Sequence, residues 1–216
     1  VALEDDRTVD LEQPLTRHPG DYLRNHDVER FGCTICHDGQ GRATVLKDAF
    51  GRDPSLHFEY PMLGQPFIQS RCYRCHVKAL DQTPVYNRGK ELFESKGCLG
   101  CHRVDGRGGA RGPTLDHISD AAPSVKHAMP ENVDALLRRT EGNRNLAYIL
   151  EAVQYPKAQP KDSAMFDFGL NDEESIALVV YLKSIEKAKV GGREYIPRER
   201  IPLSTDRNEK GRVLFA

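Results

Sequence analysis

The chain has 216 residues, of which 38% are hydrophobic and none is Trp, and its formal net charge is −1. The near-zero charge gives no support for a nucleic-acid partner, which a strongly basic surface would indicate. A chain as polar as this builds only a thin core of its own, so we expect a large apolar group to fill part of the interior.

The two ends of the chain differ in charge. Residues 1–32 hold eight acidic and four basic side chains, whereas residues 187–212 hold eight basic and four acidic ones. Either both ends are simply solvated, or they dock on partners of opposite charge. The chain opens without a signal peptide, and its longest apolar run, Ile176–Leu182, is too short to cross a bilayer. We therefore expect a mature exported protein whose leader has been removed, although loss of an N-terminal membrane anchor would leave the same start.

All six cysteines fall into three copies of the pattern Cys-x-x-Cys-His, at Cys33–His37, Cys72–His76 and Cys98–His102. Two thiols at this spacing can each form a thioether to one of two vinyl groups on a haem edge, and the following His gives its imidazole to the iron. The pattern therefore predicts three covalently bound haem c groups. The attachment residues are Cys33, Cys36, Cys72, Cys75, Cys98 and Cys101, and the iron ligands are His37, His76 and His102.

Other uses of paired cysteines fit this pattern less well. A thioredoxin-like pair occurs once and in a βαβ setting, zinc sites need no His directly after each pair, and disulfides impose no such spacing. Thioether formation needs reduced thiols and a ligation system that works, in bacteria, outside the cytoplasmic membrane. We therefore expect neither zinc nor a disulfide, and a location in the periplasm or on the extracytoplasmic face of a membrane.

Residues 1–84 carry the first two motifs in loop-rich sequence. A helical turn is expected before each motif, for instance over Asn25–Phe31, and the two haems are expected to form the core of this part. The stretch HDVERFGCTICHDGQGRAT resembles dihaem segments of other multihaem cytochromes, which implies a second His on each of these irons. We favour His26 and His57 as these ligands and keep His18 in reserve.

From Tyr86 onward the helical pattern is clear. Apolar spacing predicts a helix over Asn87–Lys96, followed by helices over Val133–Thr140 and Leu146–Gln154. The expected face of the first of these consists of Gly89, Leu92, Phe93 and Lys96.

The last predicted helix is the best defined. Asn171 is expected to cap it, and Glu174, three residues later, completes a capping box. Its expected buried stripe consists of Leu178, Leu182 and Ile185.

Residues 85–188 resemble the class I cytochrome c family. The strings that carry the resemblance are GKELFESKGCLGCHRVDGRGGARGPTLDHI and AMFDFGLNDEESIALVVYLKSI. The resemblance implies that the first and last helices cross, with Gly89 and Phe93 meeting Tyr181 and Leu182. It also implies that the carbonyl of Pro113 accepts a hydrogen bond from the His102 imidazole, which orients the iron ligand.

The same resemblance implies that Met165 is the distal ligand of the third haem. The family usually has Pro after this Met, and Phe166 stands there instead. Met129 is the rival ligand, whereas His117 and His127 are expected to be structural or solvated.

The predicted fold class is mainly α, with a loop-rich dihaem segment over residues 1–84 and a class I cytochrome c helical domain over residues 85–190. Residues 191–216 form a basic extended tail or linker. Its last seven residues, KGRVLFA, echo RGKELFE at Arg88–Glu94, either by chance or because a further cytochrome domain follows.

The predicted function is electron transfer, with no catalytic residues. A His/Met iron has a higher potential than a His/His iron, so electrons should pass from the N-terminal haems to the third one. The expected donor is a quinol- or substrate-oxidising complex, and the expected partners are redox proteins, such as subunits of a membrane-associated respiratory complex. Two alternatives remain open: a redox enzyme with an open haem acting on peroxide, nitrogen or sulfur compounds, and a filament subunit.

Overall fold

The computed structural model describes residues 18–41, 43, 45–51, 61–120, 133–158 and 163–185. These residues fall into two compact units, one belonging to Val1–Gly32 and the other to Cys33–Tyr195. Within the described residues the structure is mainly helical, which confirms the predicted fold class. None of the helices in these ranges combines the length and the apolar character needed to cross a membrane.

The described part of the first unit contains two short helices, α1 (Tyr22–Asn25) and α2 (Val28–Phe31). The carboxylate of Asp27 caps α2 by accepting a hydrogen bond from the backbone N–H of Glu29 at 2.9 Å. The helical turn predicted over Asn25–Phe31, before the first motif, is therefore confirmed, although α2 starts only at Val28.

Between residues 33 and 72, the described part of the second unit holds the short helices α3 (Thr34–His37), α4 (Leu46–Phe50) and α5 (Gln69–Cys72). Two 3₁₀ turns, η2 (Cys98–Gly100) and η3 (Ile118–Asp120), follow later in the chain. Between them lies a two-stranded antiparallel hairpin of β1 (Arg103–Val104) and β2 (Arg107–Gly108).

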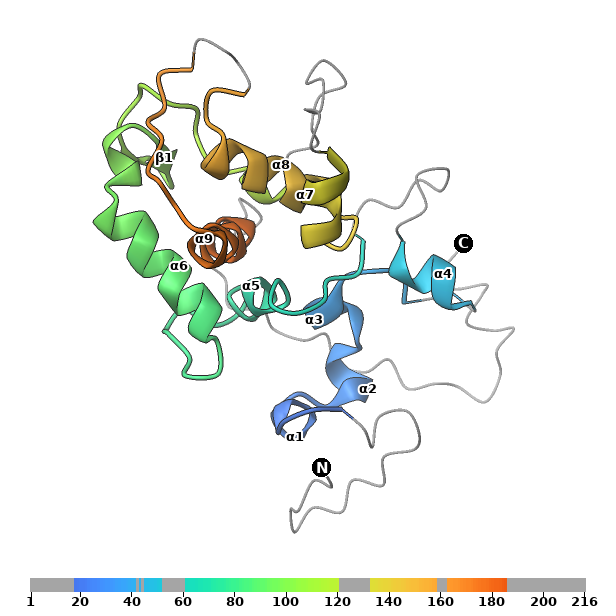
Figure 1. The fold of residues 1–216 in the computed structure, drawn as a ribbon. Coiled ribbons are helices and arrows are strands. Elements are labelled where there is room, and N and C mark those ends of the chain that lie inside the picture. Colours follow the sequence, from blue (N-terminus) through green and yellow to red (C-terminus); the bar gives the residue numbers. More distant parts are fainter. Residues whose placement is uncertain are drawn as a thin grey trace, which may run out of the picture. The chain divides into compact units, whose positions relative to one another are not determined.

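Four longer helices build the rest of this unit (Figure 1). They are α6 (Pro84–Ser95), α7 (Val133–Arg139), α8 (Arg144–Gln154) and α9 (Asp172–Lys183). Each predicted helix is confirmed within a few residues at either end. The helix α6 starts earlier than predicted because Pro84 occupies its first turn, where the missing N–H costs nothing.

The close crossing of α6 and α9 is the central packing contact of the unit. A Cβ added to Gly89 would lie 1.9 Å from the carbonyl oxygen of Ala177 and 2.9 Å from Cβ of Tyr181. The rings of Phe93 and Tyr181 lie 5.0 Å apart. The predicted contact with Tyr181 is thus confirmed, and Ala177 is a further contact. Lys96 is exposed and forms the C-cap of α6, so the buried part of the predicted face ends at Phe93.

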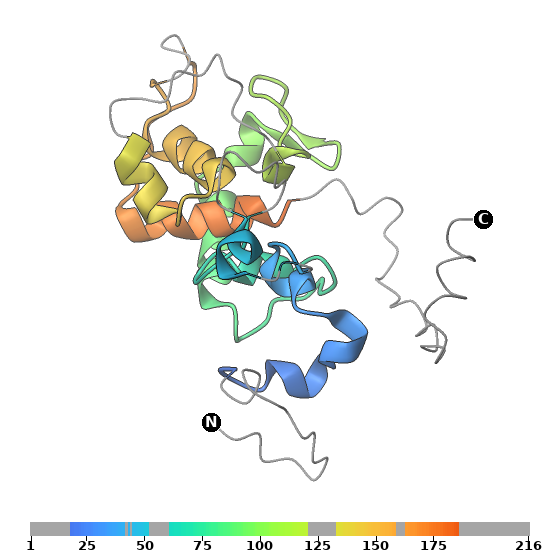
Figure 2. The ribbon, with the colours of Figure 1, turned by 90° about the vertical axis from the view of Figure 1, so that its right-hand side faces the viewer.

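The helix α9 is buried on more than the predicted stripe. Figure 2 shows it running beneath α7 and α8, and α6 packs on it as well. Buried residues therefore occur around the helix, including Val179, Val180 and the charged Lys183. The predicted capping box is confirmed, because Asn171 and Glu174 exchange both hydrogen bonds.

The buried core extends beyond the four long helices. Leu63, Phe67 and Tyr73 belong to the same apolar cluster as residues of α6 and α9. The ring of Tyr73 stacks on that of Tyr86 with centroids 3.4 Å apart. Protein side chains therefore provide core packing around the second motif. The sequence had led us to expect that the haems form the core of this part.

Candidate haem sites

The three Cys-x-x-Cys-His motifs adopt the same backbone turn. In each, the N–H of the His donates to the carbonyl of the first Cys, at 3.0, 3.0 and 2.9 Å along the chain. The N–H of the second Cys also donates to that carbonyl, at 3.3, 3.3 and 3.2 Å. This turn results from local hydrogen bonds, so each motif presents its two thiols and imidazole from one compact stretch of backbone.

All six cysteines are free thiols. Burial raises the pKa of Cys36, Cys72 and Cys98 above that of an exposed thiol. Free thiols at this spacing are what thioether attachment to a haem requires.

The third motif is held by the loop that contains Gly112 and Pro113. Nδ1 of His102 lies 2.9 Å from the carbonyl oxygen of Pro113, the contact that the family resemblance implies. When Nδ1 carries the proton and donates it to this carbonyl, Nε2 is left as the metal-binding nitrogen. Gly112 lies against the same ring, since an added Cβ would be 2.7 Å from Cε1 of His102. The loop therefore fixes the imidazole plane and leaves room for it only because residue 112 has no side chain.

Met165 lies in the irregular segment that leads into α9. Its side chain is half-buried, and its backbone N–H donates to Oγ of Ser163 at 3.2 Å. Phe166, which replaces the expected Pro, is 70% exposed. These contacts are local, and the role of Met165 as distal ligand stays a prediction. The rival Met129 lies outside the described residues.

The remaining candidate His residues divide into described and undescribed ones. In the first unit, Nδ1 of His26 lies 2.9 Å from the carbonyl of Tyr22, and Nδ1 of His18 lies 3.1 Å from that of Pro19. If Nδ1 donates in each of these contacts, Nε2 is the nitrogen that would bind a metal. These contacts therefore do not distinguish His26 from His18 as the ligand. His117 is exposed, consistent with the solvated role expected of it. His57 and His127 lie outside the described residues.

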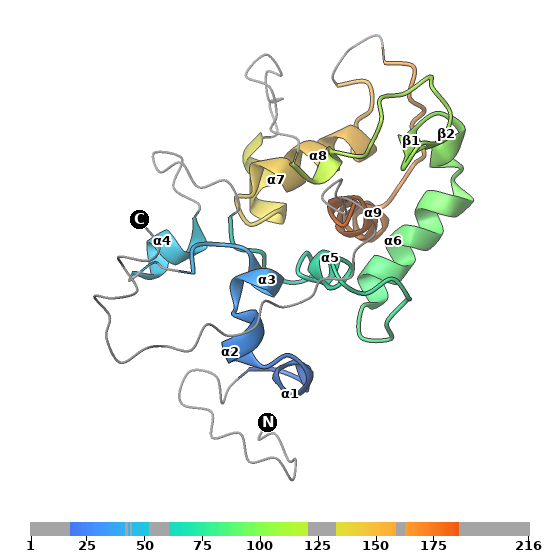
Figure 3. The same cartoon turned by 180° about the vertical axis from the view of Figure 1, so that it is seen from behind.

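The structure brings the first two motifs together, as α3 packs against α5 (Figure 3). Asp38 directly follows the first motif, Arg71 directly precedes the second, and Arg74 lies within it. The carboxylate of Asp38 forms ion pairs with both arginines. The only sign of this cluster in the sequence is a charged residue beside or within each motif.

Residues 86–186 match the family model described as cytochrome c. These residues form a cytochrome c domain. The match agrees with the predicted range of 85–188 and contains the third motif, Pro113 and Met165. A cytochrome c domain implies covalently bound haem c and electron transfer through it. The two cysteines of this motif and the His102 imidazole anchored by Pro113 fit that group.

The chain is also similar to the cytochrome c oxidase subunit 2 of Alkalihalophilus pseudofirmus, with 28% identity over 102 residues. The similarity covers 46% of this chain and 25% of that subunit, so the chain spans about a quarter of its relative. No solved structure matches the chain. The first two motifs lie outside the cytochrome c domain.

Proposed function

We propose that the protein is a trihaem c-type cytochrome that relays electrons. The observation that carries this proposal is the backbone turn common to all three motifs, one of which lies in the cytochrome c domain. Because the other two motifs have the same residues in the same turn, the chemistry implied for the third extends to them.

Each motif would hold its haem through its two thiols, with His37, His76 and His102 as iron ligands. When bound, the haems supply one-electron redox chemistry at potentials set by the second ligand and the surroundings. As a ligand of the third iron, Met165 would favour the ferrous state, whereas His26 and His57 as ligands of the other two would favour the ferric state. Electrons would accordingly enter at the N-terminal pair and leave from the cytochrome c domain.

The proposed partners are redox proteins at the extracytoplasmic face of a membrane. The named relative is a subunit of an oxidase, which supports a place within or beside a respiratory complex. The acidic residues 1–32 and the basic residues 187–212 provide docking segments of opposite sign. Contacts of this kind steer association and weaken as salt concentration rises.

Intact mass of the natively matured protein under denaturing conditions tests the cofactor count, and three covalent haem additions are expected. A redox titration with magnetic spectroscopy then reports each ligand pair. Fewer than three additions would overturn the trihaem proposal. Carbon monoxide should leave the Soret band of the reduced protein nearly unchanged, because six-coordinate irons offer no open site. A large shift, with turnover of peroxide, nitrite or thiosulfate in the absence of a partner, would favour the enzyme alternative.

A further inference from the structure

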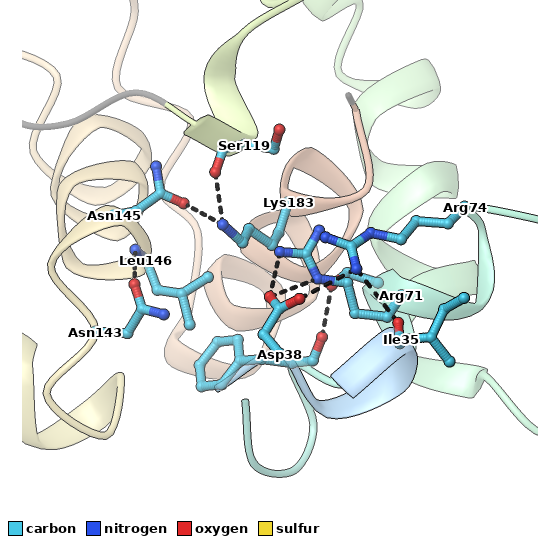
Figure 4. Close-up of polar contacts among 11 residues, drawn as sticks. Ile35, Asp38, Arg71, Arg74, Ser119, Asn143, Asn145, Leu146 and Lys183 are labelled. Atoms are coloured by element: carbon cyan, nitrogen blue, oxygen red, sulfur yellow. Dashed lines mark hydrogen bonds and ion pairs between the residues drawn. The ribbon is translucent and has the colours of Figure 1, made fainter. Parts of the chain in front are cut away.

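An ion-pair cluster formed by Asp38, Arg71 and Arg74 joins the segments of the first two motifs (Figure 4). Oδ2 of Asp38 accepts hydrogen bonds from Nε and Nη2 of Arg71 at 2.9 and 2.5 Å. Oδ1 of Asp38 lies 3.1 Å from Nη1 of Arg74. The same Nη1 donates to the carbonyl of Ile35, inside the first motif, at 3.3 Å. Arg71 and Arg74, from the segment of the second motif, therefore bind the residue that follows the first motif, and Arg74 also binds a carbonyl inside it.

The cluster is buried where it joins the motifs. The Arg71 side chain is fully buried and that of Asp38 is 5% exposed, while Arg74 is 27% exposed. Breaking such a buried pair leaves an uncompensated charge away from water, which destabilises the fold strongly. Asp38 also has φ of 54°, a left-handed conformation that an L-residue adopts at a cost. Glycine would fit this backbone more easily, so the carboxylate is the feature that the position provides.

The backbones of the two motifs also lie close together, because α3 packs against α5. The backbone around His37 is tied to the following segment as well, because its carbonyl accepts a hydrogen bond from Leu63 at 2.8 Å. Since two thioethers would hold each haem to its motif, fixing the motifs fixes the separation of the two rings.

From these contacts we infer that Asp38 and Arg71 are positioning residues that clamp the two N-terminal haems as one coupled pair and set their reduction potentials. The inference rests on the proposed haem binding by these motifs. Two guanidinium groups against one carboxylate leave a formal charge of +1 in the cluster. Because reduction adds an electron to the iron, positive charge nearby raises the potential.

The charge argument gives substitutions of opposite sign. Asp38→Asn removes a negative charge and should raise the midpoint potentials of both N-terminal haems. Arg71→Gln removes a positive charge and should lower them. Both substitutions should weaken the excitonic Soret signal between the paired rings, because both break the clamp. The potential of the third haem should stay the same.

The experiment uses the haem-loaded full chain, with mass giving the haem count, potentiometric titration the potentials, and circular dichroism the Soret coupling. Asp172→Asn is the control, since Asp172 also pairs with an arginine, Arg139, at 3.1 Å but is 79% exposed. Unchanged potentials in Asp38→Asn, or shifts of the same sign in both variants, would overturn the inference.

Two further outcomes are a variant that fails to mature and a wild-type protein that carries fewer than three haems. If a clamp variant does not mature, Arg74→Gln replaces it, because that side chain is part-exposed. This change should lower the two potentials and weaken the Soret coupling, and no effect would count against the clamp. A wild-type protein with fewer than three haems would instead refute the trihaem proposal itself.

Discussion

Replacing Gly89 with Ala tests the crossing of α6 and α9. The new methyl carbon would lie 1.9 Å from the carbonyl oxygen of Ala177, where ordinary contact begins at 3.4 Å. The two helices must therefore separate by about 1.5 Å, because the obstacle is backbone and cannot rotate away. Separation loosens the packing of Phe93 against Tyr181.

The expected loss of stability follows from two opposing terms. Overpacking of this kind costs roughly 3 kcal/mol, whereas Ala has a helix preference about 1 kcal/mol better than Gly. The net loss of about 2 kcal/mol corresponds to a fall in Tm of roughly 4–8 °C for a protein of this size. Thermal unfolding of the haem-loaded protein, followed by far-UV circular dichroism, measures it.

Lys90→Ala is the matched control, because Lys90 is exposed on the same helix. We expect its Tm to stay within about 2 °C of the wild type. If Gly89→Ala unfolds at the same temperature as the control, the two helices do not approach as closely as the structure places them.

Three further predictions concern the ligands and one buried phenol. Met165→His should lower the potential of the third haem and remove the near-infrared band of sulfur–iron(III) coordination; survival of the band would assign the site to another ligand. His26→Ala should produce one high-spin iron in the magnetic spectrum, and a low-spin spectrum would point to His18 instead. Burial raises the pKa of Tyr86, so above about pH 10 the folded chain keeps a proton that the unfolded chain loses, and stability falls as pH rises. Tyr86→Phe should make the free energy of unfolding fall less steeply with pH, as measured by denaturant titrations at several pH values. If the fall is as steep as in the wild type, Tyr86 is not the group responsible.

Local chemistry made a large part of the structure predictable. The spacing of Cys98, Cys101 and His102 specifies a haem motif because all its requirements lie within five residues. Helix signals are equally local, and Asn171 and Glu174 meet within one turn as their spacing predicts. The family resemblance extended the prediction to the contact between His102 and Pro113.

Contacts between distant parts of the chain were decided only by the tertiary structure. Asp38 and Arg71 are 33 positions apart, and nothing in either segment alone indicates the ion pair. Lys183 belongs on the solvent side of an amphipathic helix by its sequence, yet it is buried. Its Nζ donates to the carbonyl of Ser119 at 2.5 Å and to the Asn145 side chain at 2.9 Å. Sequence periodicity records which residues share a helix face, whereas the number of neighbours around a helix, and hence the partner of a buried charge, depends on how the chain packs.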